Sequence, residues 1–276
     1  MHTLMLLGAA LGYFAASIAF ARSFSRASGP GGSRTPTLIL FSAFALHTVD
    51  LGMEIARAGV LPVATFAGGF SLFAWLVAAV YLGVQARTSL LVVGVFVSPL
   101  AFLAAIADVL VRGNDVAVPA SLRTPWLTVH VTLALLGNAV FAMAFAVSAA
   151  FLLQQHLLRT KRGVSIVHRL PSVQTLDRLS LAFLLWGFPL LTLGIVSGGF
   201  LSMSTNGHFW SWEPREVLVV LTWFLYLGLL QLRLLGGLHG RKAAGWTIAA
   251  FTFLLASYVL VNLLQIGGGH HQGLTG

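Results

Sequence analysis

The sequence predicts an all-α protein that crosses a membrane about eight times, and three observations support this fold class. Apolar residues make up 58% of the 276 positions and charged residues only 8%, whereas a soluble domain carries about 25% charged residues. The apolar residues gather in runs of about 20, the length that one helix needs to cross a bilayer. Lipid offers the backbone no hydrogen bonds, so we expect these runs to be helices rather than strands.

The expected helices follow one another along the chain and are joined by short connections. They cover residues 3–21, 37–56, 67–86, 89–111, 126–153, 180–203, 216–235 and 244–265. Only the connection formed by residues 155–178 has the length of a small soluble unit, and no internal repeat is visible. We therefore expect one integral membrane domain over residues 1–276, with the first helix kept as an anchor.

Basic residues predict the orientation, because connections on the cytoplasmic side of a membrane are enriched in Lys and Arg. With the N-terminus and the C-terminus outside, twelve basic residues fall on the inner side, among them Arg233, Arg241 and Lys242, and four on the outer side. The net charge of +9 forms no basic stripe, so the expected partner is the lipid bilayer and not nucleic acid.

His130 and Trp126 are the first candidate site residues. They are four positions apart, so both side chains project from one face near the outer end of the fifth predicted helix. One interpretation of His130 is a hydrogen bond between helices. The other is an axial ligand, because neutral imidazole is a common ligand of iron.

A short segment before the seventh predicted helix combines Trp210 and Trp212 with Glu213 and Arg215. Membrane interfaces are enriched in tryptophan, which would account for one such residue. Two tryptophans within three positions also suit a surface that stacks on a large, flat aromatic ligand. Arg215 would then pair with a carboxylate of that ligand. Pro214 and Glu213 suit the first residues of a helix in either case.

Three further histidines are candidates. His270 and His271 follow the last predicted helix in a glycine-rich tail, which would fold back towards His130 or would remain a disordered tail.

His47 lies on one face with Asp50 and Glu54, and ionisable groups inside a bilayer usually mark function. Asp50 would orient the ring of His47, or the three groups would form a proton path. Alternatively, the two carboxylates lie at the outer interface.

At these residues the sequence resembles the CcsA (ResC) family of cytochrome c assembly proteins, part of a heme-handling superfamily with a tryptophan-rich outer loop. The resemblance covers most of the chain and rests on three motifs in the family's order. Residues 210–216 correspond to W-x-W-D-P-K-E, residues 126–131 to W-L-x-x-H-V, and residues 261–267 to V-N-L-L-x-I-G before a histidine. Glu213 replaces the family's aspartate, and Gln231 replaces a histidine of many members.

The resemblance implies a function in cytochrome c biogenesis. His130 and either His270 or His271 would hold heme b as axial ligands at the outer face of the bacterial inner membrane. The partners would be a CcsB (ResB)-like membrane subunit and an apocytochrome c, whose Cys-x-x-Cys-His segment supplies the thiols, since this chain has no cysteine. The protein would then be a subunit of a cytochrome c heme lyase.

Two alternatives to this function remain at the level of the sequence. The first is a HemX-like accessory or regulatory protein of heme metabolism. The second is a proton or small-solute transporter that uses His47, Asp50 and Glu54. A transporter of this kind would predict an inverted repeat or discontinuous helices, and neither is visible in the sequence.

Overall fold

The structure, a computed structural model, describes residues 2–25, 34–58, 66–88, 90–111, 125–160 and 170–269. Within these ranges the regular structure consists of helices, and no strand occurs. The helices are α1 (His2–Ser25), α2 (Thr35–Ala58), α3 (Phe66–Arg87), α4 (Leu91–Val111), α5 (Pro125–Thr160), α7 (Val173–Asn206), α8 (Pro214–Leu234) and α9 (Gly240–Gly269). All eight are long and apolar enough to cross a membrane. The predicted all-α, multi-pass membrane fold is therefore confirmed.

Two helices are longer than their predicted spans. α5 has 36 residues and α7 has 34, which at 1.5 Å per residue gives each a length of about 50 Å. The hydrocarbon core is only about 30 Å thick. α7 begins at Val173 instead of residue 180, because the Ser172 hydroxyl accepts the Thr175 N–H and caps the helix. The additional turns at the ends of α5 and α7 are helical but contain polar residues, so a search for apolar runs does not detect them.

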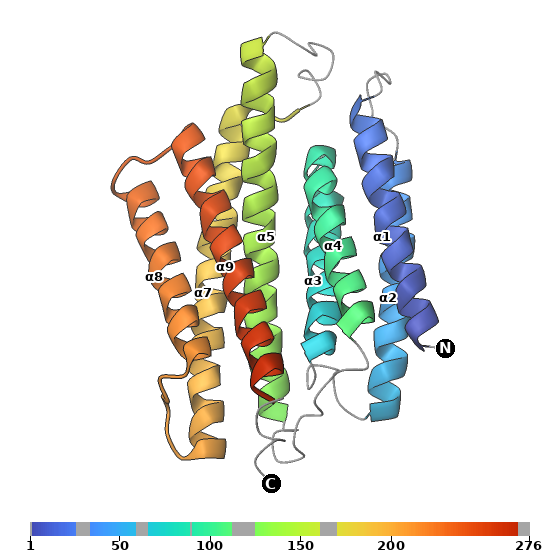
Figure 1. The fold of residues 1–276 in the computed structure, drawn as a ribbon. Helices are drawn as coiled ribbons and strands as arrows, with labels where there is room; N and C mark the ends of the chain where they lie inside the picture. Colours follow the sequence, from blue (N-terminus) through green and yellow to red (C-terminus); the bar gives the residue numbers. More distant parts are fainter. Residues whose placement is uncertain are drawn as a thin grey trace.

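The helices run alternately up and down, which places the start of α5 and the tryptophan segment at one end of the bundle. In Figure 1 the start of α5, the start of α8 and the ends of α7 and α9 all lie at the lower end. α5 is central and packs on α3, α4, α7 and α9. α1 and α2 lie on one flank and α8 on the other (Figure 1). The expectation that His130 and the tryptophan segment share one end is confirmed, whereas the membrane side of that end remains a prediction.

Small residues allow the central helices to approach closely. A Cβ on Gly187 would lie 2.6 Å from the Phe141 ring, and one on Gly137 would lie 3.1 Å from the backbone of Leu191. The Phe141 ring in turn stacks on Tyr226, with 3.7 Å between the ring centroids. Membrane helices associate through close packing of this kind, since lipid is as apolar as their side chains. The glycines of α5 and α7 therefore determine how these two helices pack.

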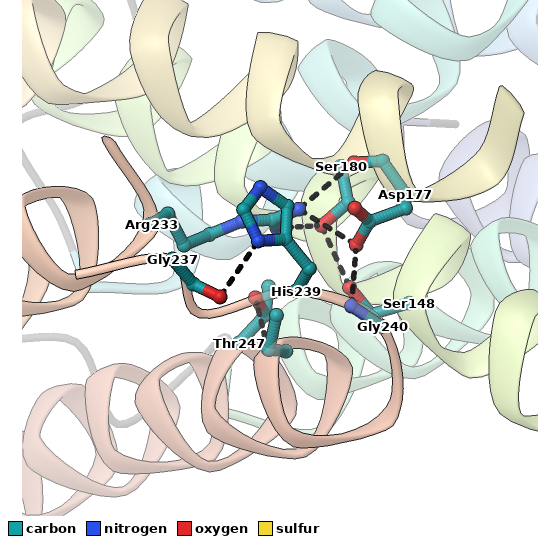
Figure 2. A network of polar contacts seen from close by, with 9 residues as sticks. Ser148, Asp177, Ser180, Arg233, Gly237, His239, Gly240 and Thr247 are labelled. Atoms are coloured by element: carbon teal, nitrogen blue, oxygen red, sulfur yellow. Dashed lines mark hydrogen bonds and ion pairs between the residues drawn. The ribbon is translucent and has the colours of Figure 1, made fainter. Parts of the chain in front are cut away.

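A buried arginine joins three helices at the opposite end of the bundle (Figure 2). Arg233 of α8 is only 2% exposed, and its guanidinium donates to Ser180 at 3.1 Å and to the Asp177 carboxylate at 2.8 Å. The same carboxylate oxygen accepts the Gly240 N–H at the start of α9. The sequence-based count of inner loop charges included Arg233. The structure places Arg233 in the last turn of α8, buried in an ion pair, and not among exposed loop residues.

The Arg233–Asp177 pair should carry measurable stability. We expect Arg233→Ala to lower the free energy of unfolding by about 3–5 kcal/mol, because it leaves the Asp177 carboxylate without its buried partner. Arg241→Ala removes an exposed charge on α9 and should change stability by less than about 0.5 kcal/mol. Thermal unfolding of both variants in the same detergent measures the difference. Equal melting temperatures for the two variants would show that the pair has no structural role.

Candidate functional site

The imidazole of His130 is held against the backbone of α7. Its Nδ1 lies 2.9 Å from the Gly194 carbonyl oxygen and 3.2 Å from the Ser197 hydroxyl. A carbonyl oxygen can only accept a hydrogen bond, so Nδ1 carries the proton and the neutral ring has its lone pair on Nε2. No atom of the described residues forms a hydrogen bond to Nε2. The predicted interhelical hydrogen bond is therefore present, and the second ring nitrogen remains available to a ligand.

Two consecutive glycines of α7 make room for this arrangement. A Cβ on Gly198 would lie 2.7 Å from Cε1 of His130, and a Cβ on Gly199 would overlap the ring of Phe209. Any larger side chain would displace the imidazole or the loop that follows α7. Our reading of the sequence missed these glycines. The signal was present, since Gly194 and Gly198 form a G-x-x-x-G spacing in an apolar helix, a known feature of close helix packing.

A chain of aromatic rings connects the start of α5 to the segment after α7. The Trp126 ring meets Phe200 edge to face, with 6.4 Å between centroids, and Phe200 meets Phe209 in the same way at 5.6 Å. Trp126 therefore reaches Phe209 of the segment through Phe200, and the sequence analysis singled out neither phenylalanine. This chain places the segment beside the helix turn that carries His130.

The segment itself, residues 207–213, is fixed at both ends; we refer to it as the tryptophan loop. At its start, Gly207 adopts a left-handed conformation (φ 76°) and its N–H caps α7 by donating to the Met203 carbonyl at 3.2 Å. At its end, Glu213 is the N-cap of α8 and Pro214 is the first helical residue. This helix start is the one that the sequence predicted.

Glu216, in the first turn of α8, binds back to the loop. Its two carboxylate oxygens accept the backbone N–H and the hydroxyl of Ser211, at 2.8 and 2.9 Å. Hydrogen bonds to a charged group contribute about 1.5–3 kcal/mol each, with values near the lower limit expected at a partly exposed site. The sequence analysis gave Glu216 no role. A glutamate at the third position of a helix is, however, a recognised partner of the residues before that helix.

The two tryptophans of the loop have different environments. Trp212 is 77% exposed and its φ is 59°, a left-handed conformation that costs a residue with a Cβ about 1–3 kcal/mol. Trp210 is partly buried and meets Trp212 edge to face, with 6.0 Å between the ring centroids. The free energy contributed by the two hydrogen bonds of Glu216 is large enough to offset the conformational cost at Trp212. The loop therefore exposes the indole of Trp212, and the partly buried indole of Trp210 packs against it.

Two buried polar atoms near the loop lack a partner among the described residues. They are Nε1 of Trp210 and the hydroxyl of Ser202, which lies one turn beyond Gly198 on α7. A buried donor without an acceptor costs about 1–3 kcal/mol. A bound group with oxygen acceptors would remove this cost, so the surroundings of the loop suit a ligand that combines an aromatic plane with polar substituents.

The remaining predicted site residues fall into two groups. Glu213 and Arg215 lie beside Trp212 and form an exposed ion pair of 3.3 Å with each other, so Arg215 can exchange this partner for a ligand carboxylate. His270 and His271 lie outside the described residues.

His47 lies apart from the site around His130. It is fully buried in α2, where Nδ1 contacts the Tyr13 hydroxyl at 3.1 Å and Nε2 contacts the Ser71 hydroxyl at 2.9 Å. α2 lies on the flank of the bundle opposite α8 (Figure 1). The structure thus brings together His130, Trp126 and the tryptophan loop, and leaves His47 in a separate polar contact that joins α1, α2 and α3.

Comparison with known proteins connects this arrangement to a family. The model of a family described as "Cytochrome C assembly protein" matches residues 36–268, which include α5, α7, α8 and the tryptophan loop. Relatives with the name "Cytochrome c biogenesis protein CcsA" include one from Chlorella vulgaris, 31% identical over 84% of this chain and 83% of its own length. Another, from Gloeothece citriformis, is 27% identical over 80% and 82% of the two chains. Since the match spans all but the first helix and the last residues, this chain belongs to the cytochrome c assembly protein family.

Proposed function

We propose that this protein binds heme b at the end of the bundle that carries His130 and presents it for covalent attachment to an apocytochrome c. The observation that carries the proposal is the bond from Nδ1 of His130 to the Gly194 carbonyl. Histidines that bind metals usually donate their other ring N–H to a carbonyl or carboxylate, which fixes the tautomer and the ring orientation. His130 has this arrangement, and its Nε2 is the expected axial ligand of the heme iron.

The second axial ligand is expected from the tail after α9. Both His270 and His271 follow a helix that ends at the same end of the bundle as His130 (Figure 1). His270 is our first choice and His271 the alternative, because the spacing of the family's motif fits His270 slightly better. Two neutral imidazoles on opposite faces of the porphyrin would make the iron six-coordinate and low-spin. Gln231 stands on α8 where many family members have a histidine, and an amide is a poor ligand of iron, so we expect a single heme per chain.

The tryptophan loop is expected to orient the porphyrin. Trp210 and Trp212 offer aromatic faces and edges to the ring, and Arg215 can pair with a propionate. Nε1 of Trp210, which has no acceptor among the described residues, is a further donor for such a group. The heme supplies the vinyl groups that form the thioether bonds, and the thiols come from the Cys-x-x-Cys-His segment of the apocytochrome. The residues of this chain would hold, orient and expose the ring.

The site requires partners and a particular side of the membrane. We place the His130 end at the outer face of a bacterial inner membrane, on the basis of the distribution of basic residues in the sequence. A CcsB (ResB)-like membrane subunit would complete a cytochrome c heme lyase with this chain. Membership of the cytochrome c assembly family supports the proposed partner.

Replacement of the proposed iron ligand provides the first test of this function. We expect His130→Ala to weaken heme binding by more than the roughly 10–100-fold that loss of an outer hydrogen-bond partner costs a metal site. His239→Ala is the matched control, since His239 is exposed at the opposite end and bonds to the Gly237 carbonyl. Heme-to-protein ratios of the purified proteins measure the effect. A His130→Ala protein with the heme content of the control would refute the assignment.

The proposed stacking makes a separate prediction for the tryptophan loop. Replacement of Trp210 or Trp212 with Phe keeps a flat ring and should change heme affinity little, whereas Ala should reduce it by about 2–10-fold, the worth of an aromatic contact. Trp246, exposed on α9 near the opposite end, should tolerate both replacements. Heme titration of the six variants decides the matter. If Ala and Phe are tolerated equally at the two loop positions, these residues are membrane-interface tryptophans.

A further inference from the structure

Glu216 connects the first turn of α8 to the part of the tryptophan loop that carries the indoles. Both of its carboxylate oxygens accept hydrogen bonds from Ser211, one from the backbone N–H and one from the hydroxyl. A glutamate at the third position of a helix usually reaches back to the N-cap residue, which is Glu213 here. The bonds to Ser211 extend two residues further, so they fix backbone that lies outside the helix.

The residue next to this contact has a conformation that a tryptophan rarely adopts. Trp212 follows Ser211 directly, has a φ of 59° and exposes most of its side chain. A left-handed residue with a Cβ persists only when its surroundings over-determine it. Glu216 holds Ser211 on one side, and the proline ring of Pro214 fixes the start of α8 on the other. Trp212 is therefore held between two constrained positions.

The other half of the loop does not depend on this contact. Gly207 ends α7 through its own backbone bond to Met203, and Phe209 packs into the space above Gly199. These interactions position residues 207–209. They leave the direction of the chain at Ser211 and Trp212 to be determined by the carboxylate of α8.

We propose that Glu216 is the positioning residue of the heme-binding surface: its carboxylate fixes the backbone at Ser211 so that the Trp212 indole stands out towards the ligand. The inference rests on the proposed function, since the loop is the surface on which we place the heme. Glu216 does not contact the heme and acts through Ser211 and Trp212. Its negative charge is also favoured at this position by the N-terminus of α8.

Hydrogen exchange of the heme-free protein directly tests the contact between the Glu216 carboxylate and Ser211, which we call the clamp. Glu216→Gln and Ser211→Ala each remove part of the contact, and Glu216→Ala removes all of it. Loss of one charge-assisted hydrogen bond should raise amide exchange in residues 210–213 by at least about tenfold, with the largest change in Glu216→Ala. Ser204→Ala is the control, since its exposed hydroxyl bonds locally to the Leu201 carbonyl at the end of α7. Peptides from the Arg233 region report whether the fold is intact.

Heme dissociation rates of the same variants then test the positioning role. We expect dissociation about tenfold faster than in wild type for Glu216→Gln and Ser211→Ala, with an unchanged low-spin absorption spectrum because His130 remains in place. Unchanged exchange in the loop would overturn the clamp whether or not the protein binds heme. Faster exchange with an unaltered dissociation rate would overturn the positioning role. If wild type takes up no heme, the proposed function fails while the exchange result still decides the clamp.

Discussion

The Nδ1–H of His130 donates to the carbonyl oxygen of Gly194 across the contact between α5 and α7, over 2.9 Å. This bond forms because Gly194 lets the α7 backbone approach that of α5 at Ala134, where a Cβ on Gly194 would lie 3.2 Å from Cα, and because Gly198 has no side chain where the imidazole lies. It determines which ring nitrogen carries the proton and in which direction the other one points. The remaining features of the site are arranged around this nitrogen.

A heme site beside His130 also requires a surface against which the porphyrin can pack. The tryptophan loop is this surface, and α8 holds it in place. Glu216 fixes the loop from the helix that follows, while Phe209 fixes it from the helix that precedes. At the opposite end of the bundle, Arg233 and Asp177 tie α8 to α7. Along their length, the Trp223 indole donates to the Thr192 hydroxyl at 3.0 Å. α8 is thus held at both ends and in the middle, so the loop is part of a rigid framework.

The sequence was sufficient for the features that depend on local chemistry. Hydropathy located the eight helices, and the Glu213–Pro214 pair located the start of α8, because each signal lies within a few residues of the structure it predicts. It was insufficient where distant segments meet. The partners of His130 are 64 and 67 positions away, and Arg233 finds Asp177 56 positions earlier. The buried partner of Arg233 was therefore not predicted, and the glycines that accommodate His130 were not recognised.

In the proposed site, Nε2 of His130, which has no partner among the described residues, binds the iron of one heme. The most direct measurement is the electron paramagnetic resonance spectrum of the full chain in lipid nanodiscs, titrated with ferric heme b. We expect saturation at one heme per chain and a low-spin signal typical of two imidazole ligands. A high-spin signal with the same stoichiometry would contradict ligation by two histidines. Heme that partitions into the nanodiscs without saturation would contradict the existence of the site.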